Sequence, residues 1–100
     1  MPINQALLDF TDNNISDAPD TPGVYGLYYA DRACRYYGSG TVSIRTRLQA
    51  HKRGDEGNCT KIASFYNWEL SSTPLSRERQ LLREYQEQYG KLPLCNEVNP

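Results

Sequence analysis

The stretch TPGVYGLYYADRACRYYGSG, residues 21–40, decides the fold, because two strand-like segments in it are separated by a short polar turn. Residues 24–29 (VYGLYY) are β-branched and aromatic, as strands are, and residues 34–38 (CRYYG) repeat that character. The stretch therefore predicts an antiparallel hairpin that turns at Ala30 and Asp31.

Two helices and a third strand are predicted after the hairpin. Ser43 can cap a helix over residues 44–53, and residues 62–70 (IASFYNWEL) predict a strand. Pro74 begins the longest helix, which ends before Gly90. The order β-β-α-β-α excludes a doubly wound parallel sheet. We expect an α+β fold with a small central three-stranded antiparallel sheet flanked by helices.

The chain divides by composition into a lead-in and one domain. Residues 1–21 form an acidic N-terminal lead-in, in which residues 3–10 allow one short helix, and residues 22–97 form the domain. Residues 54–61 (GDEGNCTK) predict a polar loop.

Composition excludes several classes of protein. With 100 residues, 38% hydrophobic and 23% charged, the chain is typical of one globular domain. It has no apolar run of membrane-spanning length and no signal-peptide pattern. Its three cysteines form no CxxC pair, so we expect free thiols and an intracellular protein, cytoplasmic or nucleoid-associated.

Charge is unevenly distributed along the chain. The net charge is −1, but residues 1–31 carry five aspartates and no lysine or arginine, whereas residues 32–61 carry seven basic and two acidic residues. A basic patch of this kind suits a polyanionic partner. A solvated face is the simpler alternative. The candidate nucleic-acid contacts are Arg35, Arg45, Lys52, Arg53 and Lys61.

Two tyrosines of the hairpin are candidates for proton transfer. A turn at Ala30 and Asp31 would put Tyr25 directly opposite Tyr36, with the two phenols side by side on one face. Aromatic packing between the strands is the alternative interpretation. In the next helix, Arg47 and His51 are four residues apart and share a face, where an arginine can make bidentate contacts with phosphate.

An acidic residue stands on the apolar face of the final helix. Glu78 lies on the stripe that Leu81, Leu82, Tyr85 and Tyr89 form. A buried carboxylate needs a cation, a hydrogen-bond donor or a raised pKa. Two interpretations remain open, an ion pair with Arg47 or Arg79 and a metal site.

These motifs, taken in order, resemble the GIY-YIG nuclease family. Gly23-Val24-Tyr25 is similar to the first signature and Tyr36-Tyr37-Gly38 to the second, although Tyr37 replaces the usual isoleucine or valine. Ser39 stands where the excision-repair members carry lysine. The resemblance covers residues 22–97.

The resemblance assigns a role to each matching residue. Arg47 matches the family's arginine in the helix after the hairpin, and His51 matches the histidine that many members carry four residues later. ERQLLR and PLCN are similar to the family's metal-binding and closing motifs, so Glu78 is the expected metal ligand and Asn96 the closing asparagine. Gly23, Gly38 and Asn96 are then structural.

The resemblance implies an endonuclease that hydrolyses phosphodiester bonds with Mg²⁺ or Mn²⁺, and DNA is the expected substrate. Tyr25 or Tyr36 would deprotonate water, Arg47 would hold the phosphate, and His51 would assist. A single site cuts one strand, so a double-strand break needs a dimer or a protein partner. Two other functions remain open: a catalytically weak domain that binds DNA or RNA, and a non-enzymatic α+β interaction module.

Overall fold

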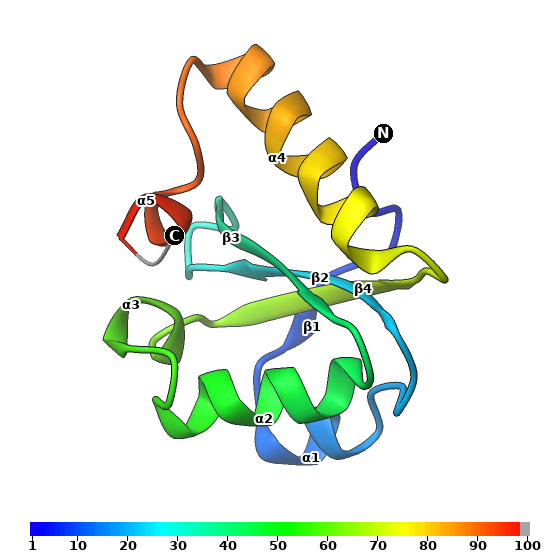
Figure 1. Cartoon of the computed structure of the whole chain (residues 1–100). Coiled ribbons are helices and arrows are strands. Elements are labelled where there is room, and N and C mark those ends of the chain that lie inside the picture. Colours follow the sequence, from blue (N-terminus) through cyan, green and yellow to red (C-terminus); the bar gives the residue numbers. More distant parts are fainter. Residues whose placement is uncertain (99–100) are drawn as a thin grey trace.

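The hairpin expected from the opening stretch forms the centre and one edge of an antiparallel sheet. In the computed structural model, which describes residues 1–98, β2 (Gly23–Tyr28) pairs with β3 (Cys34–Gly40). Strand β4 (Phe65–Leu70) pairs with β2, and the short β1 (Leu8–Asp9) pairs with β4, which gives the order β1-β4-β2-β3 (Figure 1). The predicted α+β class is confirmed. The predicted three strands are corrected to four, because β1 joins the sheet.

Helices cover both faces of the sheet. Helices α1 (Asp12–Ser16) and α2 (Ile44–Arg53) lie on one face, and α4 (Pro74–Tyr89) crosses the other (Figure 1). The short α3 (Asn58–Lys61) contacts α2, and α5 (Leu94–Val98) contacts β3. Within the part of the chain described, no helix combines the length and the apolar character needed to cross a membrane.

The two long helices begin and end where the sequence predicts. The Ser43 hydroxyl accepts a hydrogen bond of 3.1 Å from the backbone N–H of Thr46 at the start of α2, and Gly54 ends that helix with φ of 91°. Pro74 is the first residue of α4, which Gly90 ends with φ of 77°. Glycine adopts this left-handed conformation without steric cost.

The N-terminal segment folds differently from its prediction. Residues 3–10 do not form the expected short helix, because Leu8 and Asp9 are drawn into the sheet as β1. The brief helix α1 follows, and Phe10 and Ile15 are buried beneath the sheet. The acidic lead-in over residues 1–21 is thus built into the same folded unit as the rest of the chain.

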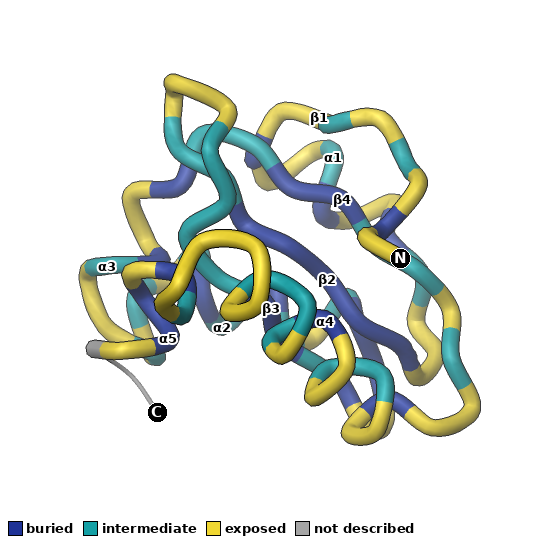
Figure 2. The backbone as a smooth tube through the Cα atoms, turned by 90° about the horizontal axis from the view of Figure 1, so that it is seen from above, coloured by how far each residue is buried: buried dark blue, intermediate teal, exposed yellow. Residues whose placement is uncertain are grey.

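Strand β2 is buried along nearly its whole length (Figure 2), and each of its faces packs against its own apolar cluster. Tyr25 and Leu27 belong to the cluster on the α2 side, and Val24 belongs to the cluster on the α4 side. The α2-side cluster consists of Phe10, Ile15, Ala18, Tyr25, Leu27, Ile44, Leu48, Ala63 and Tyr66. The α4-side cluster consists of Ile3, Val24, Tyr37 and Leu81. A tyrosine hydroxyl is therefore carried into the interior by the central strand.

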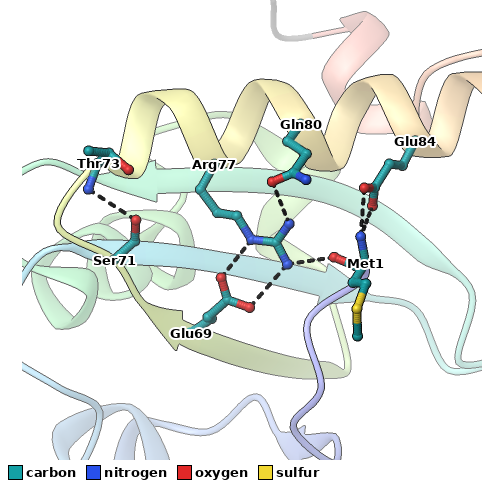
Figure 3. A network of polar contacts seen from close by, with 7 residues as sticks. All are labelled: Met1, Glu69, Ser71, Thr73, Arg77, Gln80 and Glu84. Atoms are coloured by element: carbon teal, nitrogen blue, oxygen red, sulfur yellow. Dashed lines mark hydrogen bonds and ion pairs between the residues drawn. The ribbon is translucent and has the colours of Figure 1, made fainter.

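Arg77 holds α4 against the sheet. Its guanidinium donates hydrogen bonds of 2.6 and 3.1 Å to the carboxylate of Glu69 in β4, and one of 2.9 Å to Gln80 (Figure 3). Another turn of α4 is held by Glu84, whose carboxylate pairs with the amino group of Met1 at 2.6 Å. These contacts fix the position of Glu78, the residue after Arg77.

A disulfide links two short helices at one end of the sheet. Cys59 of α3 and Cys95 of α5 are bonded, with their Cα atoms 5.7 Å apart, and Cys34 is free. The expectation of three free thiols is therefore wrong for this pair, because the fold brings together cysteines that are 36 residues apart. The sequence-based expectation of an intracellular protein relied on free thiols. It is no longer supported by the cysteines, since disulfides persist in oxidising compartments.

Candidate active site

The hairpin places Tyr25 and Tyr36 on the same face of the sheet, although not directly opposite each other. Tyr25 faces Gly38 on β3, and Tyr36 faces Leu27, so the predicted register is wrong by two residues. The causes are a longer turn, in which Arg32 adopts a left-handed φ of 67°, and a register irregularity between Leu27 and Tyr28. The phenol rings are diagonal neighbours, with centroids 6.2 Å apart.

Gly38 leaves the space that the two phenols occupy. A Cβ atom at this position would lie 2.6 Å from the hydroxyl oxygen of Tyr25 and 2.6 Å from Cε2 of Tyr36. Any side chain here would displace at least one ring, because real Cβ contacts are never that short. Gly23, the other glycine expected to be structural, is packed as closely against the backbone of Glu69 and the side chain of Ile44.

His51 lies at the centre of the site and is fully buried. Its Nε2 is 2.7 Å from the hydroxyl oxygen of Tyr25, and its Nδ1 is 2.8 Å from Oγ1 of Thr60. Its ring also meets the ring of Tyr36 edge-on, with centroids 5.0 Å apart. Burial, followed by the positive charge of Arg47, lowers the pKa of His51 to about 4, so the imidazole is neutral near pH 7.

Both phenols are protonated in the free protein. Burial raises the pKa of Tyr25 far above its ordinary value, and the neighbouring Tyr36 raises it further, while Arg47 acts in the opposite direction. Burial and the negative charge of Glu78 raise the pKa of Tyr36. Arg47 does favour the phenolate of Tyr25, but desolvation outweighs this effect, so the pKa is raised overall in the free chain.

Arg47 lies one helical turn before His51 and reaches the same site. Its positive charge acts to lower the pKa of Tyr25, and its guanidinium forms an ion pair with Glu56. The Arg47 side chain is 38% exposed, so one side of it remains open to solvent. The arrangement gives the site an accessible positive charge that already has a carboxylate as its partner.

Glu78 approaches the site from α4, past the edge strand β3. Its Oε1 accepts a hydrogen bond of 2.7 Å from the hydroxyl of Ser39, and the residue is half-buried. The hydrogen-bonding partner shown is thus Ser39, whereas the sequence suggested Arg47 or Arg79. The charge of Glu78 raises the pKa of both Tyr25 and Tyr36, which places the carboxylate within electrostatic range of the phenols.

Glu78 is the candidate to bind a metal, and it would do so without a cluster of protein ligands. Among residues 1–98, no three His, Cys, Asp or Glu side chains gather at one point. Mg²⁺ in sites that act on phosphates is typically held by one or two carboxylates together with water and the substrate. A half-buried carboxylate at the rim of the site fits that kind of coordination.

The basic residues expected to bind nucleic acid are distributed over several surfaces. Arg45 donates to the backbone carbonyl of Ala18 at 2.8 Å, and Arg53 pairs with Asp55. Lys52 lies over the ring of Phe10, and Lys61 is exposed. These four residues come from α2 and α3.

Arg35 is separated from the other basic residues. It pairs with Asp31 at 2.9 Å and stacks on Tyr29, and it lines a small cavity with Tyr85 and Lys91 on the α4 side of the sheet. The structure therefore places four of the five predicted contacts on α2 and α3 and places Arg35 on the α4 side of the sheet.

Asn96 fixes the backbone of β3 beside the catalytic candidates. Its Oδ1 accepts a hydrogen bond of 2.9 Å from the N–H of Tyr37, and its Nδ2 donates one of 3.0 Å to the carbonyl of the same residue. The side chain is buried and makes both contacts from α5. The preceding residue, Tyr36, is positioned by this strand.

Thr60 is, like Glu56, a site residue that sequence reasoning missed. It lies on α3, in a segment that the sequence predicts as a polar loop, and its side chain is buried against His51. A threonine in such a segment carries no pattern that distinguishes it from a solvated residue.

No protein-family model matches this chain, and no curated protein matches it. The resemblance to GIY-YIG nucleases thus rests on the motifs and their order.

Proposed function

We propose that this protein is a metal-dependent endonuclease of the GIY-YIG type that hydrolyses phosphodiester bonds in DNA. The observation that carries the proposal is the contact of Tyr25 with His51 at 2.7 Å, beside Tyr36 and Arg47. Phosphodiester hydrolysis needs a group that takes a proton from water and a cation that faces the phosphate. These side chains could supply both within one site.

Arg47 is the phosphate-binding group in this proposal. Its planar guanidinium can hold two phosphate oxygens, and it stabilises the negative charge that grows as water attacks. In the free chain Glu56 occupies the guanidinium. A substrate phosphate would take the place of that carboxylate, so Arg47 would release Glu56 when the substrate binds.

We assign Tyr25 as the residue that takes the proton from water, because His51 lies within hydrogen-bonding distance and can accept the phenolic proton. The hydroxyl lies 2.7 Å from Nε2 of His51, which is neutral. As water attacks, its proton would pass to the Tyr25 oxygen while the phenolic proton moves to Nε2. Tyr25 is fully buried in the free chain, so substrate binding at Arg47 must also open access to its hydroxyl. Tyr36, which is half-buried, would line the entrance.

Glu78 would hold the metal ion at the rim of the site. Bound Mg²⁺ would withdraw charge from the non-bridging oxygens and the leaving oxygen. The carboxylate accepts a hydrogen bond from Ser39, and the contacts of Arg77 with Glu69 tie α4 to β4. The chain thus supplies one fixed carboxylate, and the substrate and water would complete the coordination.

The basic residues on α2 and α3 would bind the DNA backbone beside the site. Lys52 and Arg53 follow Arg47 on α2, and Lys61 is exposed at the end of α3. One site cuts one strand, so cutting both strands would need a dimer or a partner protein.

A plasmid-nicking assay tests the function directly. We expect supercoiled DNA to be nicked with Mg²⁺ and left intact with EDTA. Tyr25→Phe keeps the buried ring and removes the hydroxyl, and it should abolish nicking, whereas Tyr89→Phe, on the exposed end of α4, should not alter it. Salt-sensitive DNA binding without nicking would favour the nucleic-acid-binding alternative, and neither activity would favour an interaction module.

A further inference from the structure

The buried contact between Thr60 and His51 gives the imidazole a hydrogen-bonding partner at Nδ1. Thr60 is 1% exposed, and its Oγ1 is 2.8 Å from Nδ1 of His51. The adjacent residue, Cys59, is anchored twice: it is bonded to Cys95, and its carbonyl accepts a hydrogen bond of 2.8 Å from the hydroxyl of Tyr29. The threonine is therefore held firmly against the ring.

The proton positions follow from the donors around Tyr25. Arg47 acts on the Tyr25 hydroxyl electrostatically, and an arginine side chain can only donate hydrogen bonds, so it cannot accept the phenolic proton. The single phenolic proton then points to the other neighbour, Nε2 of His51, 2.7 Å away. Nε2 must be unprotonated to accept it. A neutral imidazole has one proton, which therefore sits on Nδ1 and is donated to Oγ1 of Thr60.

We propose that Thr60 is a positioning residue that holds His51 in the Nδ1–H tautomer and so keeps Nε2 ready to receive the proton of Tyr25. This role in the reaction rests on the nuclease function proposed above. The other tautomer would point an N–H at the hydroxyl of Tyr25. The phenolic proton would then have no acceptor on His51, and Tyr25 could not pass it on as water attacks. Thr60 touches neither substrate nor metal in this scheme and acts through His51.

Two substitutions of Thr60 distinguish the effect of its hydrogen bond from the effect of its side-chain volume. Thr60→Val keeps the shape and removes the acceptor, and Thr60→Ser keeps the acceptor. Because His51 is the only histidine in the chain, the ¹⁵N and ¹H shifts of its imidazole report the tautomer without overlap. We expect the Nδ1–H form in the wild type and in Thr60→Ser, and its loss in Thr60→Val. If the wild-type spectrum shows the Nε2–H form, the proposal is overturned. This measurement uses only the wild-type protein, so it does not depend on whether Thr60→Val folds.

Cleavage kinetics test whether the tautomer matters for the reaction. We expect kcat for nicking to fall about 10- to 100-fold in Thr60→Val with KM for DNA near the wild-type value, and Thr60→Ser to restore most of kcat. A Thr60→Val variant that has lost the Nδ1–H form and still cuts at the wild-type rate overturns the role in proton transfer. If the wild type shows the expected tautomer and cuts no DNA, the assignment of Thr60 stands and the nuclease function falls.

Discussion

The hydroxyl of Ser39 donates a hydrogen bond of 2.7 Å to the carboxylate of Glu78, which joins the edge strand β3 to helix α4. The two residues are 39 positions apart in the chain, and their contact brings the candidate metal ligand to the phenols. The carboxylate is half-buried, so it keeps access to water and to a cation.

Glu78→Gln should abolish metal-dependent cleavage and change folding stability little. The amide oxygen of glutamine can still accept the Ser39 hydroxyl, so we expect the free energy of unfolding in EDTA to change by about 1 kcal/mol or less. Nicking assays and thermal melts with and without Mg²⁺ measure both effects. Glu87→Gln, exposed on the same helix, is the control and should cut normally. A destabilised Glu78→Gln protein that still cuts DNA would refute the metal assignment.

Arg47→Lys should remove most cleavage while the charge is kept. A lysine offers a point charge where the planar guanidinium contacts Tyr25 and phosphate together, so we expect kcat to fall by about 100-fold or more. Arg45→Lys, on the same helix, tests the specificity of the effect, because Arg45 contacts the carbonyl of Ala18. Near-normal cleavage by Arg47→Lys would exclude Arg47 from the site.

Folding stability should fall as the pH is lowered from about 6.5 to about 4, because the unfolded state protonates His51 and the folded state does not. Burial and Arg47 depress the pKa of His51 from 6.5 to about 4 in the folded protein. The unfolded chain therefore binds more protons in this window, and the loss is on the order of 3 kcal/mol. Denaturant melts at several pH values measure it. In His51→Gln the free energy of unfolding should depend less steeply on pH. An equal pH dependence in the variant and the wild type would contradict the depressed pKa of His51.

Binding of DNA should depend on the basic residues beside the site. Replacing Lys52, Arg53 and Lys61 with glutamine should weaken binding and reduce the salt dependence by up to about three phosphate contacts. The matched control replaces Arg32, Arg83 and Lys91, which are exposed elsewhere. Titrations at several salt concentrations compare the two triple variants. If the salt dependence of binding were unchanged when Lys52, Arg53 and Lys61 are replaced, and reduced in the control variant, the DNA would have to bind on the α4 side.

The Cys59–Cys95 disulfide should stabilise the fold substantially. It closes a loop between residues 36 positions apart, so Cys95→Ser should lower the free energy of unfolding by about 4 kcal/mol. Cys34→Ser is the control, since Cys34 is free and burial raises the pKa of its thiol to about 11. Denaturation of each protein with and without reductant measures the effect. A reductant that destabilises Cys95→Ser as much as the wild type would argue against this bond.

The parts of the fold that depend on neighbouring residues in sequence could be predicted. Ser43, Gly54, Pro74 and Gly90 mark the ends of helices because caps and left-handed turns are local features. The strand β1 could not be predicted in the same way. It has two residues, and its extended conformation comes from pairing with β4.

Only those parts of the candidate site that depend on residue spacing within one helix or one strand could be predicted from the sequence. The four-residue separation of Arg47 and His51 places both on one side of α2, as the sequence predicted. The register of Tyr25 was not predictable, because it depends on the number of residues in the turn and on the irregularity between Leu27 and Tyr28. Thr60 and Glu56 reach the site from segments whose path is set by tertiary contacts.

The side chain of Asn96 also affects how the sheet ends. β3 is an edge strand, and the N–H and C=O of Tyr37 that bind Asn96 are the groups that an added strand would use. The asparagine amide uses its carbonyl oxygen as an acceptor and one N–H as a donor here, as a peptide group does, so it takes the place of a neighbouring strand at this point. Exposed edges are templates for intermolecular pairing and aggregation. By satisfying this edge from within the chain, Asn96 prevents another molecule from extending the sheet at Tyr37.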